Sequence, residues 1–177
     1  LRLNDDGTVP TDNPWQDRGE IARQFWTVGH RNMLGIDFDA DGRLWVHEMG
    51  PRHGDELNLI APGLNYGWPV VTYGLNYNGT VISEFTRKAG MEVPNLYWKP
   101  SIAVCGLDFY RGEKFSKWKN RLLVGALKYE EVNLLDIEQD RVIHQETILK
   151  NAGRVRDVAC GPDGLIYVVL NRPGMVL

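Results

Sequence analysis

The chemically richest part of the chain runs from residue 29 to residue 77. Within it, the dipeptide Gly50-Pro51 lacks one backbone donor, and the carboxylates of Asp55 and Glu56 follow closely. Carbonyl and carboxylate oxygens are the hard ligands that calcium prefers, so this loop is a candidate calcium site. Its spacing is not that of an EF-hand, and a solvated acidic loop explains the same residues equally well.

Basic side chains near the expected strand ends form a second candidate group. Arg154 and Arg156 are two residues apart, so an extended strand places both side chains on one face. Two guanidinium groups on one face suit an acidic ligand, because each can grip a carboxylate through paired hydrogen bonds. Arg31 and Asn32 before one strand, and Lys128 after another, are further candidates. As ordinary surface residues, the cations would discourage edge aggregation and Asn32 would suit a turn.

Short strands separated by Gly, Pro, Asn and Asp turns must position these residues. The pattern Asp-Gly-x-(Leu/Ile)-(Trp/Tyr)-Val occurs at 41–46 and again at 163–168. An Asp-Gly pair between two apolar runs predicts a hairpin, since glycine accepts the positive φ of a tight turn. A third, degenerate copy at 106–125 replaces the turn by an insert with room for one helical turn.

Repeated units of this kind predict an all-β fold, and a β-propeller in particular. At roughly 40–50 residues per blade, the chain would contain about three to four blades. An ordinary β-sandwich is the alternative on pattern alone. We expect a short helix within 13–24 and a surface loop at 84–92. Residues 1–3 and 175–177 read as interrupted strands, which indicates a single partial domain over 1–177.

The composition excludes several classes of protein. The chain has 177 residues and a formal net charge of −3, and it lacks the basic stripe of a nucleic-acid-binding protein. Its uncharged apolar runs are only a few residues long, too short to span a membrane. Cys105 and Cys160 lie far apart in strand-like segments, and either two buried thiols or one disulfide fits them.

Five segments carry a more specific signal together than any of them does alone. They are Gly-His-Arg-Asn at 29–32, Leu-Trp-Val-His-Glu-Met-Gly-Pro-Arg-His-Gly-Asp-Glu-Leu-Asn-Leu-Ile at 44–60, Asn-Tyr-Gly-Trp-Pro at 65–69, Gly-Ala-Leu-Lys at 125–128 and Arg-Val-Arg-Asp-Val at 154–158. In this order they resemble the soluble, pyrroloquinoline-quinone-dependent aldose sugar dehydrogenases and their soluble glucose dehydrogenase relatives. That family folds as a six-bladed propeller, so the resemblance implies roughly three blades from its C-terminal half.

The resemblance also implies a cofactor site. The residues expected to contact the quinone are Arg31, Asn32, Lys128, Arg154 and Arg156. The chemistry agrees with this set, because the quinone carries three carboxylates and a ring of fixed cations offsets their charge.

Two calcium ions are implied as well. The first lies against the quinone and is held partly by the backbone carbonyls of Gly50 and Pro51. A divalent ion there polarises the reactive carbonyl as a Lewis acid. The second is structural, and its implied counterparts in this chain are Glu56, Tyr66 and Tyr77.

The implied reaction oxidises the anomeric hydroxyl of an aldose to a lactone, while hydride passes to the quinone. The family's base is a histidine in the N-terminal half of the propeller, and neither His30 nor His53 matches its context. Relatives commonly continue Arg-Asn with Pro-Gln-Gly, where this chain has 33–35 as Met-Leu-Gly, so the sugar is undefined. We expect a periplasmic or secreted protein that associates with the remaining propeller half or a second copy.

Two other functions are compatible with the same scaffold, because fold does not fix function. One is a non-enzymatic propeller that binds sugar or protein. The cations would distinguish it, since their convergence on one pocket would favour the quinone. The other is a lactone-hydrolysing propeller that uses calcium alone. It would need several carboxylate and amide side chains around one ion, and the Gly50-Pro51 carbonyls argue against it.

Overall fold

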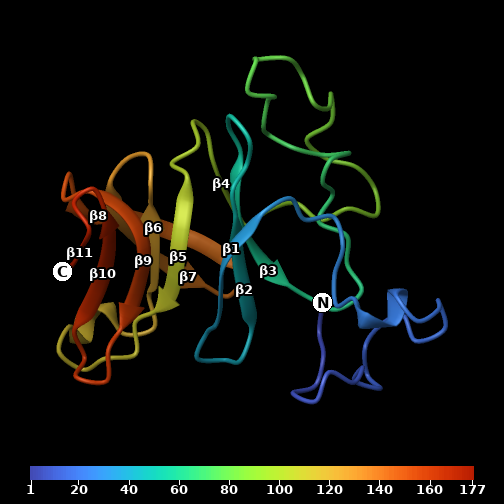
Figure 1. Cartoon of the computed structure of the whole chain (residues 1–177), viewed down its shortest axis with the longest axis horizontal. Helices are drawn as coiled ribbons and strands as arrows, with labels where there is room; N and C mark the ends of the chain where they lie inside the picture. The colour runs from blue at the N-terminus through green and yellow to red at the C-terminus, as the bar shows by residue number, and fades with distance from the viewer.

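The computed structural model describes residues 1–177 and consists of three antiparallel sheets that stand side by side (Figure 1). The first sheet contains β1 (Met33–Phe38), β2 (Leu44–Glu48), β3 (Asp55–Ile60) and β4 (Leu96–Trp98). The second contains β5 (Val104–Phe109), β6 (Leu122–Ala126), β7 (Glu131–Glu138) and β8 (Arg141–Lys150). The third contains β9 (Arg154–Cys160), β10 (Ile166–Asn171) and β11 (Met175–Val176).

The sheets are successive blades of a β-propeller, as predicted. Their first strands β1, β5 and β9 contact one another in that order, so each sheet faces the next. Neighbouring elements along the chain are joined antiparallel within each blade, which is the repeat that a propeller requires. Two three-residue 3-10 helices, η1 (Ala22–Gln24) and η2 (Ser116–Trp118), are the only helices, and neither is long enough to cross a membrane.

Two hydrophobic cores lie between neighbouring blades. Alternating side chains of the same strand contribute to both of them. On β6, Leu122 and Val124 belong to the cluster shared with the first blade, together with Trp45. Leu123 points the other way, into the cluster shared with Val158 of the third blade. Because successive side chains of a strand alternate between faces, one continuous apolar strand serves two cores.

The two predicted hairpins are present. In the first, the Asp39 backbone N–H donates to the Arg43 carbonyl oxygen at 3.0 Å, and Gly42 has a φ of 75°. In the second, the Gly161 N–H donates to the Leu165 carbonyl oxygen at 2.8 Å. The insert of the third copy contains η2, which is the single helical turn that the sequence predicts.

The expectations for the two ends of the chain, for the short helix and for the surface loop have mixed outcomes. The strand expected at residues 1–3 is wrong, because only Arg2 makes a backbone bond there, to the Gln24 carbonyl oxygen. The expected helix within 13–24 is confined to η1. Residues 84–92 form neither helix nor strand, as predicted, and β11 confirms a strand at the C-terminal residues.

Each of the three inner strands carries a β-bulge near its N-terminal end. The pairing register slips between Met33 and Gly35 in β1, and between Val104 and Leu107 in β5. In β9 the extra residue is Arg156, which lies between the paired positions on either side of it. Bulges re-aim side chains, and three of them at the same level mark this end of the blades as a candidate site.

Candidate functional site

The inner strands run in parallel, and the same ends of all three meet. The Cys105 thiol donates to the Arg156 carbonyl oxygen at 2.7 Å near the N-terminal ends of β5 and β9. β2 and β6 run back to this end, where Glu48 pairs with Met33 and Ala126 with Val104. The fold therefore gathers at one end almost every residue predicted for the site: Arg31, Asn32, Gly50, Pro51, Glu56, Tyr66, Lys128, Arg154 and Arg156.

Arg31 is held in place just before β1. Its backbone N–H donates to Glu48 Oε2 at 2.6 Å, and its Nη1 donates to the Met49 carbonyl oxygen at 2.7 Å. The guanidinium carbon also lies 5.5 Å from the ring centroid of Trp68. The carbonyl of the neighbouring Asn32 accepts the Met49 N–H at 2.9 Å, which leaves the exposed amide side chain of Asn32 available.

Glu48 was not singled out from the sequence, yet its carboxylate contacts both His30 and Arg31 just before β1. Its Oε1 lies 3.0 Å from His30 Nδ1, and the other ring nitrogen of His30 lies 3.0 Å from Thr27 Oγ1. The His30 ring also stacks on Tyr66, with centroids 4.7 Å apart. Both nitrogens of His30 are thus engaged within the protein, which agrees with the expectation that His30 is not the family's base. Glu48 stands two residues before Gly50, and that proximity was the only signal in the sequence.

A small cavity at this site is lined by the buried Glu48 and the half-buried Glu56. It has a volume of about 10 Å³, and Arg31, Glu48, Gly50, Glu56 and Tyr66 are among its lining residues. Burial, reinforced by the nearby Glu48 carboxylate, raises the pKa of Glu56 to about 8. A cavity of this size accommodates a single water-sized particle. A cation in it would offset the repulsion that disfavours the charged form of Glu56.

The two tyrosines predicted near Glu56 are placed differently. Tyr66 is buried, and its hydroxyl donates to the Leu59 carbonyl oxygen at 2.7 Å while accepting the Ala61 N–H at 2.9 Å. Only its backbone is left to contribute a ligand. Tyr77 is 71% exposed and is not among the residues that line the cavity. The structure therefore brings Tyr66 to Glu56 but not Tyr77.

The Gly50-Pro51 turn is tightly packed, and its carbonyls are unengaged. A Cβ on Gly50 would lie 2.2 Å from the His53 carbonyl oxygen, so only glycine fits there. The Gly50 N–H donates to Asp55 Oδ1 at 2.9 Å. Neither the Gly50 nor the Pro51 carbonyl oxygen accepts a backbone hydrogen bond. No three His, Cys, Asp or Glu side chains are grouped to hold a metal ion, so a cation here would draw on such carbonyls.

The convergence of the cations on one pocket, which would favour the quinone, is not seen in the structure: Arg31 lines the small cavity of Glu56, whereas Lys128, Arg154 and Arg156 line none of the five main cavities. Lys128, Arg154 and Arg156 make none of the ion pairs in the structure. Arg154 Nε is buried and has no hydrogen-bond partner, which is costly unless a ligand supplies an acceptor. Val155 between the two arginines is fully buried, so they extend away from the core. None of the three cations lines the small cavity of Glu56.

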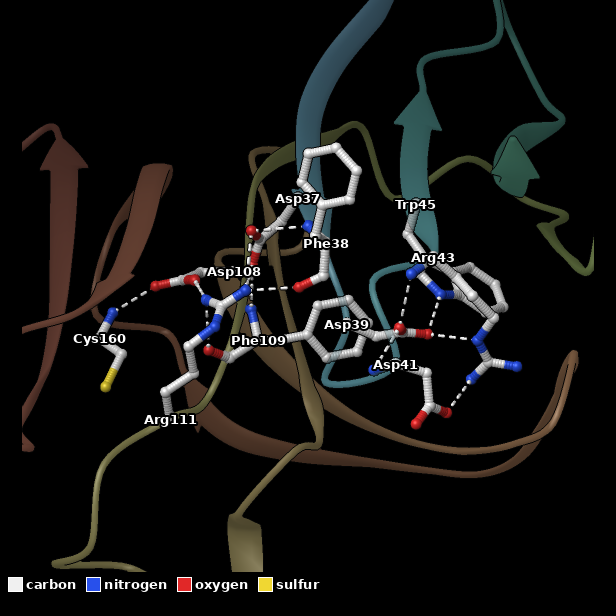
Figure 2. Close-up of polar contacts among 10 residues, drawn as sticks. All are labelled: Asp37, Phe38, Asp39, Asp41, Arg43, Trp45, Asp108, Phe109, Arg111 and Cys160. Atoms are coloured by element: carbon white, nitrogen blue, oxygen red, sulfur yellow. Dashed lines mark hydrogen bonds and ion pairs between the residues drawn. The ribbon is translucent and has the colours of Figure 1, made fainter. Parts of the chain in front are cut away.

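The opposite ends of the inner strands are closed by paired charges (Figure 2). Asp37 Oδ2 accepts the Phe109 N–H at 2.8 Å, and Asp108 Oδ2 accepts the Cys160 N–H at 2.5 Å. Arg111 donates to both Asp37 oxygens and to Asp108 Oδ1, each at 2.9 Å. These contacts join each blade to the next, and they pair Arg111 with acidic groups of the protein itself.

The cysteines do not form a disulfide. Cys105 on β5 and Cys160 on β9 are both free and partly buried. Of the two readings open from the sequence, separate thiols are therefore the one realised here. Burial raises the pKa of the Cys105 thiol, so it stays protonated and can donate to the Arg156 carbonyl oxygen.

Comparison with known proteins decides the family. The whole chain, residues 1–177, matches the family described as Glucose / Sorbosone dehydrogenase. The chain belongs to this family. The predicted resemblance and the predicted propeller fold are both confirmed.

Individual relatives agree. Aldose sugar dehydrogenase YliI of Escherichia coli K12 is 42% identical over 173 residues, which cover 96% of this chain and 47% of that protein. A solved glucose dehydrogenase structure superimposes with a TM-score of 0.91 at 41% identity, over 95% of this chain and 50% of that one. The PQQ-bound aldose sugar dehydrogenase from Streptomyces coelicolor gives 0.71 at 26% identity, covering 96% and 45%. The chain spans about half the length of these relatives.

Proposed function

We propose that the protein containing this chain oxidises the anomeric hydroxyl of aldoses to lactones with calcium-bound pyrroloquinoline quinone. The observation that carries the proposal is the group of unpaired cations at the N-terminal ends of the inner strands. Among them, buried Arg154 Nε has no acceptor within the protein. An unsatisfied buried donor destabilises the fold, and an acceptor oxygen of a bound ligand would remove that cost.

The cations fit the quinone by charge and by chemistry. Lys128, Arg154 and Arg156 are free to pair with its carboxylates, since no acidic side chain neutralises them. Arg31 adds a fourth cation, and Glu48 fixes its backbone. When bound, the quinone supplies an electrophilic carbonyl that accepts hydride from the sugar. The chain's contribution is to hold the charged ring in one orientation, which lowers the entropy cost of the reaction.

Calcium fits the neighbouring turn. The Gly50 and Pro51 carbonyl oxygens are unengaged by the backbone and would contribute two hard ligands next to the quinone. A second ion would be held by Glu56 with the backbone of Tyr66, whereas the exposed Tyr77 lies outside this cavity and is not among the proposed ligands. The raised pKa of Glu56 supports this, because a carboxyl that is costly to ionise in the protein alone gains most from a cation.

We assign the catalytic base to no residue of this chain. Both nitrogens of His30 are engaged, and His47 is fully buried with Nε2 bonded to the Gly106 carbonyl oxygen at 2.9 Å. The chain then supplies the binding half of the site, and the base comes from the remaining propeller half or a second copy. A periplasmic or secreted location is a further part of this proposal.

The test separates binding from turnover. The purified protein is titrated with the quinone and calcium, and binding is followed by quinone absorbance. Reduction of a dye is then measured with glucose and other aldoses. Binding without turnover by the 177-residue chain alone is the expected result, with turnover when the missing half is present. Absence of quinone binding in either form would overturn the proposal. The Arg154→Ala variant is the negative control.

A further inference from the structure

We propose that Asp55 is a positioning residue, which fixes the carbonyls of the Gly50-Pro51 turn and the backbone of Lys128 in one frame. The inference rests on the proposed function, since it concerns how that site is held together. From the sequence, Asp55 is a candidate calcium ligand in an acidic loop. The structure gives its carboxylate a different task.

The Asp55 carboxylate is completely committed to donors of the protein. The residue has no exposed surface. Its Oδ1 accepts the Gly50 N–H at 2.9 Å and the Ser101 hydroxyl at 2.6 Å. Its Oδ2 accepts the Ala103 N–H at 2.7 Å and the Val104 N–H at 3.3 Å. With two donors on each oxygen, the carboxylate is a hub between segments rather than a metal ligand.

This hub joins the two arms of the proposed site. On one side it holds Gly50, whose carbonyl is proposed to bind calcium. On the other side it holds Ala103, whose own carbonyl oxygen accepts the Leu127 N–H at 2.8 Å. One residue later in the second segment and one residue earlier in the first, the Lys128 N–H donates to the Ile102 carbonyl oxygen at 3.0 Å. The first and second blades are therefore tied together where calcium and quinone would meet.

The strained backbone of Ala103 shows why the hub must be strong. Its φ is 58°, in the left-handed region that a residue with a Cβ rarely adopts. Such a conformation persists only when its surroundings over-determine it. The two bonds from Asp55 to Ala103 and Val104 supply that constraint, and they need a second carboxylate oxygen. In Asp55→Asn, one of the two oxygens is replaced by an NH₂ group. That group cannot accept hydrogen bonds from the Ala103 and Val104 N–H groups.

A purely structural carboxylate elsewhere in the protein provides the matched control. Asp39 accepts the Arg43 N–H at 2.9 Å and Trp45 Nε1 at 2.9 Å, and only 7% of its side chain is exposed. It directly follows the C-terminal end of β1, whereas the proposed site lies at the N-terminal end of that strand. Asp39→Asn therefore removes a comparable set of buried contacts without touching the frame around Gly50.

The experiment measures the calcium concentration needed for half-maximal quinone binding, well below each variant's melting temperature. Loss of a side chain that orients a metal ligand commonly weakens the metal site by about 10- to 100-fold. We expect Asp55→Asn to raise the calcium requirement by about tenfold or more. Asp39→Asn should lower the melting temperature and leave that requirement within about twofold of wild type.

Ser101→Ala is the milder second variant, because it removes one donor to Asp55 and keeps the carboxylate. It should raise the calcium requirement by about threefold. A folded Asp55→Asn with the wild-type requirement overturns the inference. Should Asp55→Asn not fold, an unchanged requirement in Ser101→Ala overturns it. A wild-type protein that binds no quinone is a distinct result, which overturns the proposed function itself.

Discussion

At the N-terminal ends of β1, β5 and β9, the arginines Arg154 and Arg156 make no ion pair, and one of them buries an unpartnered donor. At the C-terminal ends of the same strands, Arg111 is clamped between the carboxylates of Asp37 and Asp108 (Figure 2). Both ends are polar and both lie where blades meet. They differ because acidic side chains of the protein pair with Arg111 at one end, whereas none pairs with Arg154 or Arg156 at the other.

This difference in charge pairing distinguishes the end proposed to bind a ligand from the end that holds neighbouring blades together. Where the protein pairs its own charges, the gain is blade-to-blade attachment, as in the Asp37 bond to Phe109 in the next blade. Where it leaves cations unpaired, Lys128 and Arg156 are exposed to solvent, and only the buried Arg154 Nε carries a desolvation cost that a ligand oxygen would offset. The bulges of the inner strands lie at the second kind of end, where Arg156 is itself the extra residue. On the proposed function, ligand binding and blade cohesion are thus assigned to opposite ends of the same strands.

The largest effect is expected from removing both free arginines. Arg154→Ala combined with Arg156→Ala should weaken quinone binding about a thousandfold, because hydrogen bonds to charged groups contribute ~1.5–3 kcal/mol each. Titration at fixed calcium measures this. The melting temperature should hardly fall, since neither side chain pairs with an acid. A variant that binds quinone like the wild type would remove the basis for calling this end a binding site.

The next effect concerns how closely the inner strands approach. A Cβ on Gly106 would lie 2.7 Å from the Asp157 Cα and from the Val158 backbone nitrogen, and its φ is 73°. Gly106→Ala should cost about 3 kcal/mol in the free energy of unfolding. Gly42 has a similar φ of 75° but open space around it, so Gly42→Ala should cost only about 1 kcal/mol. Equal losses in denaturant melts would show that the blade contact is looser than described.

Arg111→Ala tests the paired end directly. It leaves Asp37 and Asp108 facing each other without their shared cation, and should lower the free energy of unfolding by about 1.5 kcal/mol. Quinone affinity should stay at the wild-type value, in contrast to the Arg154 and Arg156 variant. Chemical denaturation measures the predicted loss of stability, and a quinone titration of the same samples measures the predicted unchanged affinity. Reduced quinone affinity in stably folded Arg111→Ala would contradict the division between the two ends.

The smallest effect is a pH dependence with opposite signs at two carboxylates. Burial alone would raise the pKa of Asp39, but hydrogen bonds from Trp45 and Arg43 together lower it. Its stabilisation is therefore present above about pH 4 and is lost as the pH falls further. Burial, with neighbouring Asp37, raises the pKa of Asp108, so its ionisation costs stability that is regained on acidification.

Asn variants measure these slopes. The stability difference between wild type and Asp39→Asn should shrink by about 1 kcal/mol or less below pH 4. The difference between wild type and Asp108→Asn should instead shift in favour of the wild type over the same range. Urea melts from pH 7 to pH 3 are sufficient. Two slopes of the same sign would mean that the carboxylates are not held as described.

The sequence predicted what depends on local chemistry. The hairpins at 41–46 and 163–168 follow from Asp-Gly turns, and the helical turn in the third repeat follows from the length of its insert. The gathering of Arg31 and Lys128 at one end of the blades was foreseen only through the family resemblance. Neither residue carries a local signal that distinguishes it from a surface cation.

What the sequence missed depends on contacts between distant segments. Asp37 bonds to Phe109 across 72 residues, and Asp55 bonds to Ala103 across 48 residues. Nothing in the neighbourhood of either aspartate distinguishes a buried hub from a solvated carboxylate. Glu48 was overlooked for the same reason, because its partner His30 is 18 residues away and on another segment. The strand expected at residues 1–3 is wrong because an alternating pattern predicts a strand only where a partner strand exists.

The most direct test is a crystal structure of the protein with pyrroloquinoline quinone and calcium added. We expect quinone carboxylates within hydrogen-bond distance of Arg154 and Arg156, and anomalous calcium density against the Gly50 and Pro51 carbonyl oxygens. Quinone bound elsewhere, with both arginines without contact to it and no ion at the turn, would contradict the proposed site.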